Sequence, residues 1–141
     1  MTERFDVAEL TRFTTDLFTK AGLDEDKATA VSRYLIEADL MGHTTHGLAL
    51  ASWYLQSVRD GVMKTTGSFE VVSDRGAAQC WNGHRLPGAW LTSEAVKSAI
   101  KRAREFGTAT VAIANSHHIG ALAAYLSLAT DQSMLVSVAS S

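Results

Sequence analysis

Apolar side chains recur at spacings of three and four residues along about the first 60 positions, a period typical of amphipathic helices. The spacing predicts a helix over 6–21 with Asp6 as its N-cap, a second helix from Asp24 to about Met41, and a third from about His46 to Asp60. The side chains expected to face the core are Leu10, Phe13, Leu17, Phe18 and Ala21 in the first helix, and Ala28, Val31, Leu35, Ala38 and Met41 in the second.

The hydrophobic pattern changes after about residue 65. Segments 69–73 and 78–81 are β-prone and flank the turn sequence Asp-Arg-Gly at 74–76, so they are predicted strands. The later elements are expected to be a helix over 90–106, a strand buried on both faces over 108–114, a short helix over about 120–131 and a buried strand over 134–139. The pattern therefore predicts a helical segment followed by an α/β segment, with the boundary between them near 62–68.

Composition places the chain among globular proteins. Of its 141 residues, 46% are apolar and 20% are charged, and the net charge is −2. We therefore expect neither nucleic acid nor an anionic membrane as a partner, because both attract an excess of positive charge. A single cysteine, Cys80, excludes an internal disulfide and a multi-cysteine zinc site, and its apolar surroundings predict a core thiol.

The sequence also bears on location. No apolar run reaches the roughly 18 residues needed to span a bilayer. The first residues are polar and acidic, without the basic start and apolar core of a signal peptide. The expected compartment is the cytoplasm.

Histidines form two tight clusters at predicted junctions. His43 and His46 lie in a turn between two helices, and His117 and His118 follow a predicted strand. Ligands of open α/β sheets bind at the carboxyl ends of strands, and histidine exchanges protons near neutral pH. The clusters are therefore candidates for acid–base chemistry.

Two other interpretations of the clusters stay open. Turns rich in His, Thr, Asn and Gly often only cap the next helix. The His43-x-x-His46 spacing could also place two metal ligands on one helical face, which would suit a metal-dependent hydrolase. No third ligand stands out nearby, so no metal site is expected.

The two clusters resemble motifs of one enzyme family. Residues 37–47 read Glu-Ala-Asp-Leu-Met-Gly-His-Thr-Thr-His-Gly, close to the pattern Ala-Asp-Leu-x-Gly-x-x-Ser-His-Gly, and residues 115–120 read Asn-Ser-His-His-Ile-Gly, close to Asn-Ser-x-His-x-Gly. Both patterns are similar to those of the malate/L-lactate dehydrogenase family, which also holds ureidoglycolate, sulfolactate, diketogulonate and piperideine-carboxylate enzymes. The resemblance runs from about residue 5 to the last residue.

The resemblance implies interconversion of a 2-hydroxy acid and a 2-oxo acid with NAD or NADP. It also implies a homodimer, and a mixed, mostly antiparallel α/β fold that is not a classical Rossmann fold. That fold agrees with the absence of a Gly-x-Gly-x-x-Gly fingerprint from the sequence. Residues 1–65 would form a helical segment, and residues 66–141 would form the first part of the α/β domain.

Site residues are carried over from the family motif by motif. The resemblance implies that His46 and His118 are acid–base or substrate-contacting groups and that Thr45, in place of the family's serine, orients His46. The residues that would contact the substrate are Tyr54, Asn115, Ser116 and Arg85, and those that would contact the cofactor are His118 and Gly120.

One position departs from the family pattern. Leu50 stands four residues after His46, where the family commonly has an arginine suited to a forked pair with the substrate carboxylate. Either Arg85 or a residue outside these 141 takes that role, or the substrate differs.

The length gives a further expectation, since family members are more than twice as long. We expect the chain to be the front portion of a larger enzyme, with exposed apolar edges, poor solubility and no turnover in isolation. A truncated, non-catalytic product is therefore an alternative to the dehydrogenase.

Overall fold

A computed structural model describes residues 4–140, and its elements follow the predicted order closely. The α-helices are α1 (Val7–Lys20), α2 (Glu25–Leu40), α3 (Ala51–Arg59), α4 (Gly88–Phe106) and α5 (Ser127–Thr130). The 3₁₀ turns are η1 (Thr44–His46), η2 (Leu48–Leu50) and η3 (Leu122–Tyr125). The strands are β1 (Glu70–Asp74), β2 (Ala78–Asn82) and β3 (Thr110–Ala114).

The first helix begins where the sequence predicts but turns a different side to the core. The Asp6 side chain accepts a hydrogen bond from the Glu9 N–H at 2.9 Å, which confirms the predicted cap. Thr14 and Phe18 are buried, whereas the Phe13 side chain is 63% exposed. The prediction for Phe13 was wrong because the buried face is centred between positions 14 and 18, about 120° around the helix from position 13.

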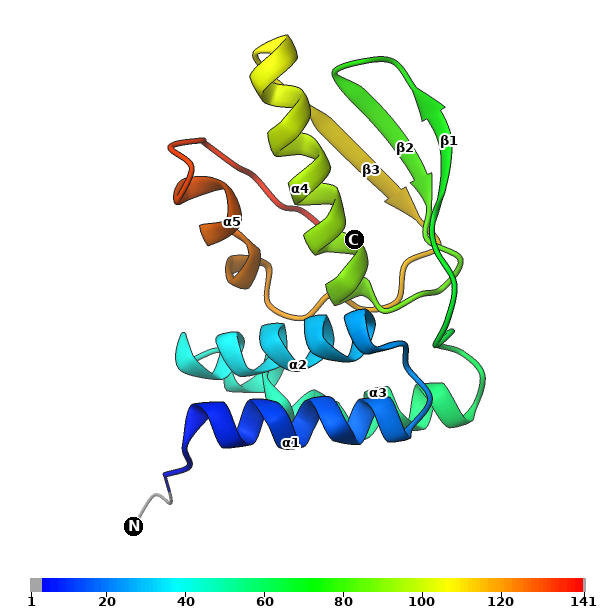
Figure 1. The fold of residues 1–141 in the computed structure, drawn as a ribbon, viewed down its shortest axis with the longest axis vertical. Helices are drawn as coiled ribbons and strands as arrows, with labels where there is room; N and C mark the ends of the chain where they lie inside the picture. The colour runs from blue at the N-terminus through cyan, green and yellow to red at the C-terminus, as the bar shows by residue number, and fades with distance from the viewer. Residues whose placement is uncertain (1–3, 141) are drawn as a thin grey trace.

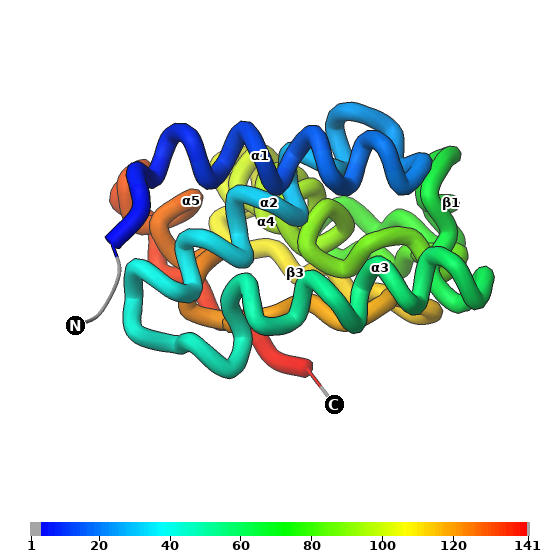
Figure 2. Tube along the Cα trace, turned by 90° about the horizontal axis from the view of Figure 1, so that it is seen from below, coloured from blue at the N-terminus to red at the C-terminus, as the bar shows by residue number. Residues whose placement is uncertain are grey.

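The second helix joins the lower helical layer to the rest of the molecule. α2 lies between α1 and α4 (Figure 1), and Figure 2 shows the lower layer of α1, α2 and α3 from below. Its predicted core residues, Ala28, Val31, Leu35 and Ala38, are all buried. Met41 is exposed, against the prediction, because the helix ends at Leu40 and the chain turns there.

The predicted third helix starts later than expected. Residues 44–50 form two successive 3₁₀ turns, and the α-helix begins only at Ala51. His46 therefore lies in a 3₁₀ turn capped by His43 rather than on the predicted α-helix.

The strands form a mixed sheet in the order β1-β2-β3. β1 pairs antiparallel with β2, and β2 pairs parallel with β3, with Trp81 opposite Ile113 in the second pair. α4 makes the crossover between the parallel strands and runs along one face of the sheet (Figure 1). The expected mixed α/β architecture is confirmed.

The sheet is covered on one face only among the described residues. In β2, Gln79 and Trp81 are buried toward α4, so Cys80 points the other way and is exposed, not a core thiol. The prediction that β3 is buried on both faces was also wrong. Its residues alternate between half-buried and exposed because no described element covers the second face.

The predicted last strand is absent from the described chain. Residues 134–139 make no ladder with β1, β2 or β3. Met134, Val136 and Val138 pack against the core and Leu135 is fully exposed, which keeps the period-two pattern that suggested a strand. A strand needs a hydrogen-bonded neighbour, which a hydrophobic pattern cannot supply.

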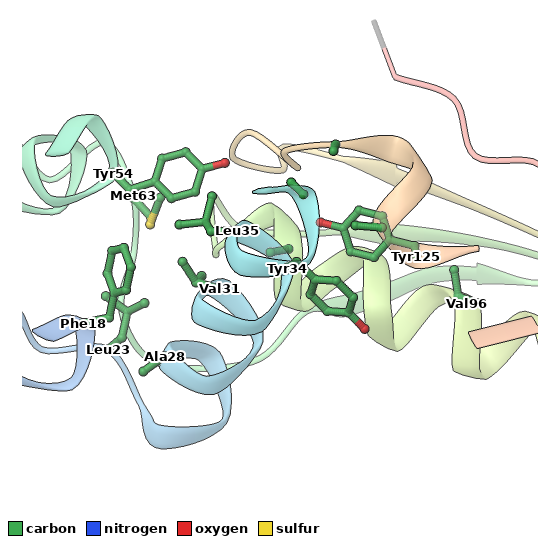
Figure 3. Packing of buried hydrophobic residues seen from close by; sticks show 14 of the residues in the cluster. Phe18, Leu23, Ala28, Val31, Tyr34, Leu35, Tyr54, Met63, Val96 and Tyr125 are labelled. Carbon is green, nitrogen blue, oxygen red and sulfur yellow. The ribbon is translucent and has the colours of Figure 1, made fainter. Parts of the chain in front are cut away.

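One hydrophobic core connects the helical and the α/β parts. Phe18, Leu35 and Tyr54 from the first part lie in the same cluster as Val96 and Tyr125 from the second (Figure 3). The division at residue 65 stays a prediction. No helix within residues 4–140 is long and apolar enough to cross a bilayer.

Candidate functional site

The two histidine motifs, about 70 residues apart in sequence, meet in space. The rings of His46 and His118 are stacked, with centroids 6.0 Å apart and planes inclined by 25°. His46 comes from the turn that joins α2 to α3, and His118 from the loop that follows β3. Both rings are therefore close enough to contact one small ligand.

The turn that carries His46 is tied to α2 by a carboxylate. The Leu48 N–H donates to Asp39 Oδ2 at 2.8 Å. A Cβ atom on Gly47 would lie 2.1 Å from Asp39 Oδ1, so only glycine allows this close approach. Asp39 and Gly47 together fix where His46 stands, which spacing along the sequence could not show.

Thr45 contacts the histidine that it was predicted to orient. Its Oγ1 lies 3.0 Å from His46 Nδ1, within hydrogen-bond distance. Both residues are exposed, so the contact leaves the other ring nitrogen, Nε2, for a ligand.

His118 is held by two groups at one ring nitrogen. The Tyr54 hydroxyl lies 2.8 Å from His118 Nδ1, and the Gly120 N–H donates to the same atom at 3.2 Å. Gly120 has a φ of 71°, which suits glycine. Burial lowers the pKa of His118 and the nearby His46 lowers it further, which favours the uncharged ring.

The start of α4 packs directly on the backbone of the second motif. A Cβ atom on Gly88 would lie 2.1 Å from the carbonyl oxygen of His117 and 2.5 Å from that of His118. Since Gly88 is the first residue of α4, the start of this helix positions the loop that carries His118.

His117 turns into the protein instead of outward. Its side chain is buried, and its Nδ1 has no hydrogen-bond partner within residues 4–140. Burial lowers the pKa of His117 to about 4, with smaller effects from His118 and Arg85. His117 is therefore neutral at physiological pH.

Trp53 is a site neighbour that the sequence did not reveal. Its indole, 47% exposed, has its ring centroid 5.3 Å from those of both His117 and His118. A helical period alone does not show that α3 lies beside the loop after β3.

The remaining predicted residues lie in the turns that follow β2 and β3. Arg85 and Asn115 have positive φ values of 64° and 54°, and the Arg85 N–H donates to the Asn115 carbonyl at 2.6 Å. The Asn115 amide bonds to Asn82, and the Ser116 hydroxyl bonds to the His117 carbonyl. Left-handed non-glycine residues are uncommon and cluster at functional sites.

Leu50 contributes no polar group to this cluster. It is half-buried and packs against the main core. Among residues 4–140, no group of three or more His, Cys, Asp or Glu side chains is arranged to hold a metal ion.

Comparison with known proteins gives a single family. The sequence model of malate/L-lactate dehydrogenase matches residues 5–141. Hydroxycarboxylate dehydrogenase B of Escherichia coli O157:H7 is 36% identical over 117 residues, which cover 83% of this chain and 32% of the relative. Malate/(S)-sulfolactate dehydrogenase of Methanothermus fervidus is 29% identical over 81% of this chain and 34% of the relative.

The fold agrees with the sequence match. The crystal structure of malate dehydrogenase from Entamoeba histolytica superimposes with a TM-score of 0.89 at 26% identity, over 94% of this chain and 37% of that one. The chain thus spans about a third of the length of the relatives that it matches.

Proposed function

Because the chain belongs to the malate/L-lactate dehydrogenase family, we propose that it takes part in interconverting a 2-hydroxy acid and a 2-oxo acid with NAD or NADP. The observation that carries the proposal is the meeting of His46 and His118, with ring centroids 6.0 Å apart. The matched relatives are about three times as long, so the activity is proposed for the longest reading frame that contains these residues.

The histidines suit the chemistry of carbonyl reduction. When bound, the nicotinamide cofactor supplies the hydride that adds to the carbonyl carbon. The carbonyl oxygen then gains negative charge and needs a proton donor and hydrogen bonds. We assign these tasks to His46, which Thr45 orients, and to His118.

Two aromatic rings near the histidines support the proposed nicotinamide contacts. The half-exposed indole of Trp53 and the ring of His118 offer flat surfaces on which a planar ring can pack. The Gly120 N–H is engaged by His118 Nδ1, so it is not free to bind a phosphate. Gly120 and His118 are therefore proposed as contacts to the ring part of the cofactor.

Substrate contacts are proposed from residues around the two rings. Arg85 is the candidate cation for a carboxylate, because its charge acts on His117 and Leu50 is an apolar side chain packed against the core. Ser116, Asn115 and the Tyr54 hydroxyl would shape the pocket. A homodimer in the cytoplasm completes the proposal, as the family resemblance implies.

The test is a scan of 2-oxo acids with NADH and NADPH, using the longest available reading frame. Pyruvate, oxaloacetate, sulfopyruvate and a cyclic imino acid belong in the panel. Oxidation of either cofactor with one of them would support the proposal. A folded protein that turns over none of them would favour the non-catalytic alternative.

Removing either histidine tests its role in the reaction. His46→Ala and His118→Ala should each lower kcat by about 10²–10⁴-fold, because each removes a group that donates to the reacting oxygen. His84→Ala is the control, since His84 lies in another turn and faces Glu70. Near-normal rates in both site variants would contradict the assignment.

A further inference from the structure

We propose that the cleft between α4 and α5 is a second binding site, which takes a small organic phosphate. Basic side chains of α4 would bind the phosphate group, and the apolar floor of the cleft would contact the organic group. The inference goes beyond the proposed function, because it involves neither the histidine cluster nor the hydride transfer.

The cleft lies where α5 packs beside the C-terminal half of α4 (Figure 1). Its volume of about 330 Å³ is at the lower end of the range of small-molecule sites, roughly 300–1,000 Å³. Lys97 lies nine residues after Gly88, about 14 Å along the helix, so the cleft is separate from the histidine cluster. The lining residues are Lys97, Ile100, Lys101, Arg104, Leu128 and Gln132.

Three basic residues converge on the cleft from α4. Lys97, Lys101 and Arg104 follow one another at spacings of four and three residues, which places them on one face of the helix. Like charges at these spacings repel and destabilise a helix. Only Arg104 lies in the last turn, where the helix dipole favours a cation. Helix stability therefore does not account for this arrangement, whereas an anion in the cleft would offset the repulsion.

Most of this positive charge has no counter-charge. The Lys97 ammonium bonds to Glu94 Oε1 at 2.6 Å. Within residues 4–140, no carboxylate forms an ion pair with Lys101 or Arg104, and none lines the cleft. A phosphate monoester carries a charge of about −1.5 to −2 at neutral pH, which matches these two cations better than a single carboxylate does.

Arg104 is held in place at the rim of the cleft. The Gln132 amide donates to the Leu128 carbonyl at 2.8 Å, and its oxygen accepts from the Arg104 guanidinium. Because the amide is neutral, the charge of Arg104 stays uncompensated, and only one of the five guanidinium N–H groups is used. A guanidinium fork fits phosphate oxygens, and its fixed position lowers the entropy cost of binding.

The floor of the cleft is apolar. Ile100 is 7% exposed, and Leu128 packs against the main core. An organic group that covers these side chains removes apolar surface from water, and it also strengthens the attraction between the charges beside it. A flat anionic membrane would not reach this floor, and the net charge of −2 opposes its approach. The cleft therefore favours a small soluble ligand.

Phosphorus-31 NMR of hexyl phosphate tests the site without any turnover. The longest reading frame that contains these residues should bind the compound saturably, and added salt should weaken the binding. Lys101→Glu reverses one of the two uncompensated charges and should weaken the affinity by about tenfold or more. The Lys101 side chain is exposed and forms no ion pair within residues 4–140, so the variant should fold.

Lys20→Glu is the matched control, since Lys20 is an exposed lysine at the end of α1, outside the cleft. It should leave the affinity unchanged. Equal losses in the two variants would overturn the proposal, as would saturable binding that Lys101→Glu does not weaken.

Inorganic phosphate tests the contribution of the apolar floor. It should bind about fivefold more weakly than hexyl phosphate, because it lacks the group that covers Ile100 and Leu128. Equal affinities, or no saturable binding of hexyl phosphate, would contradict the inference. Co-sedimentation with phosphatidylserine vesicles that Lys101→Glu abolishes would overturn the choice of a small soluble ligand. None of these results depends on oxidation of NADH or NADPH, so each is separate from the test of the proposed function.

Discussion

Short polar contacts determine what each histidine can do. Nδ1 of His46 meets a threonine hydroxyl, and Nδ1 of His118 meets two donors. Both rings therefore leave Nε2 for a ligand, and they differ in how many groups hold Nδ1. Their placement depends on residues that touch neither ring, of which Asp39 is the clearest.

Asp39 should affect turnover through the position of His46. Asp39→Ala removes the acceptor of the Leu48 N–H, which lets the 43–47 turn move, and a shift of about 1 Å can cost about 10²-fold in rate. Asp39→Asn retains an oxygen acceptor and should keep kcat within about tenfold. The two variants are compared by kcat and KM. Equal rates in both would show that the Leu48 contact does not place His46.

At the scale of elements, each helix is defined by the face that it buries. α1 turns Phe18 into the cluster that holds Leu35 and Tyr54, so the layer that supports α3 depends on this side chain. The neighbouring aromatic residue, Phe13, contributes nothing to that cluster. The same helix therefore offers a buried and an exposed phenylalanine for comparison.

The pair allows a matched test of the helix orientation. Phe18→Ala should lower the free energy of unfolding by about 3–5 kcal/mol, because it leaves a cavity in the core. Phe13→Ala should change it by no more than about 0.5 kcal/mol, since its side chain is mostly in solvent. Denaturant unfolding measures both. A larger loss for Phe13→Ala would mean that α1 is rotated from the position described.

At the scale of the whole molecule, the helical and α/β parts share one hydrophobic core, whereas the sheet of the described residues has two unpaired edges. One hydrophobic cluster connects α1, α2 and α3 with α4 and α5. β1 and β3 are both edge strands, and β1 presents the exposed Val71 and Val72 beside an irregularity in its pairing. Unpaired strand edges with apolar side chains promote association between chains.

A protein made of these 141 residues should therefore self-associate through β1. Val72→Lys should weaken that association by about tenfold, or about 1.4 kcal/mol, because a charged edge resists pairing. Sedimentation at several concentrations measures it. Leu40→Lys, an equally exposed apolar residue at the end of α2, is the control. The β1 edge is not responsible if the control has the same effect.

Local patterns in the sequence determined much of the fold. The α2 stripe, the Asp6 cap and the paired strands around the Asp-Arg-Gly turn depend on neighbouring residues, so spacing was enough to predict them. The two histidine motifs were also visible as sequence, and their resemblance to one family is confirmed by the match over residues 5–141.

Tertiary structure alone decided the contacts between distant segments. No local pattern shows that Trp53 lies beside His117, that Gly88 touches the loop of His118, or that Tyr54 holds its Nδ1. The exposure of Cys80 and the missing ladder at 134–139 have the same origin. Periodicity reports which face of an element is apolar, whereas burial and hydrogen bonding depend on which other element covers that face.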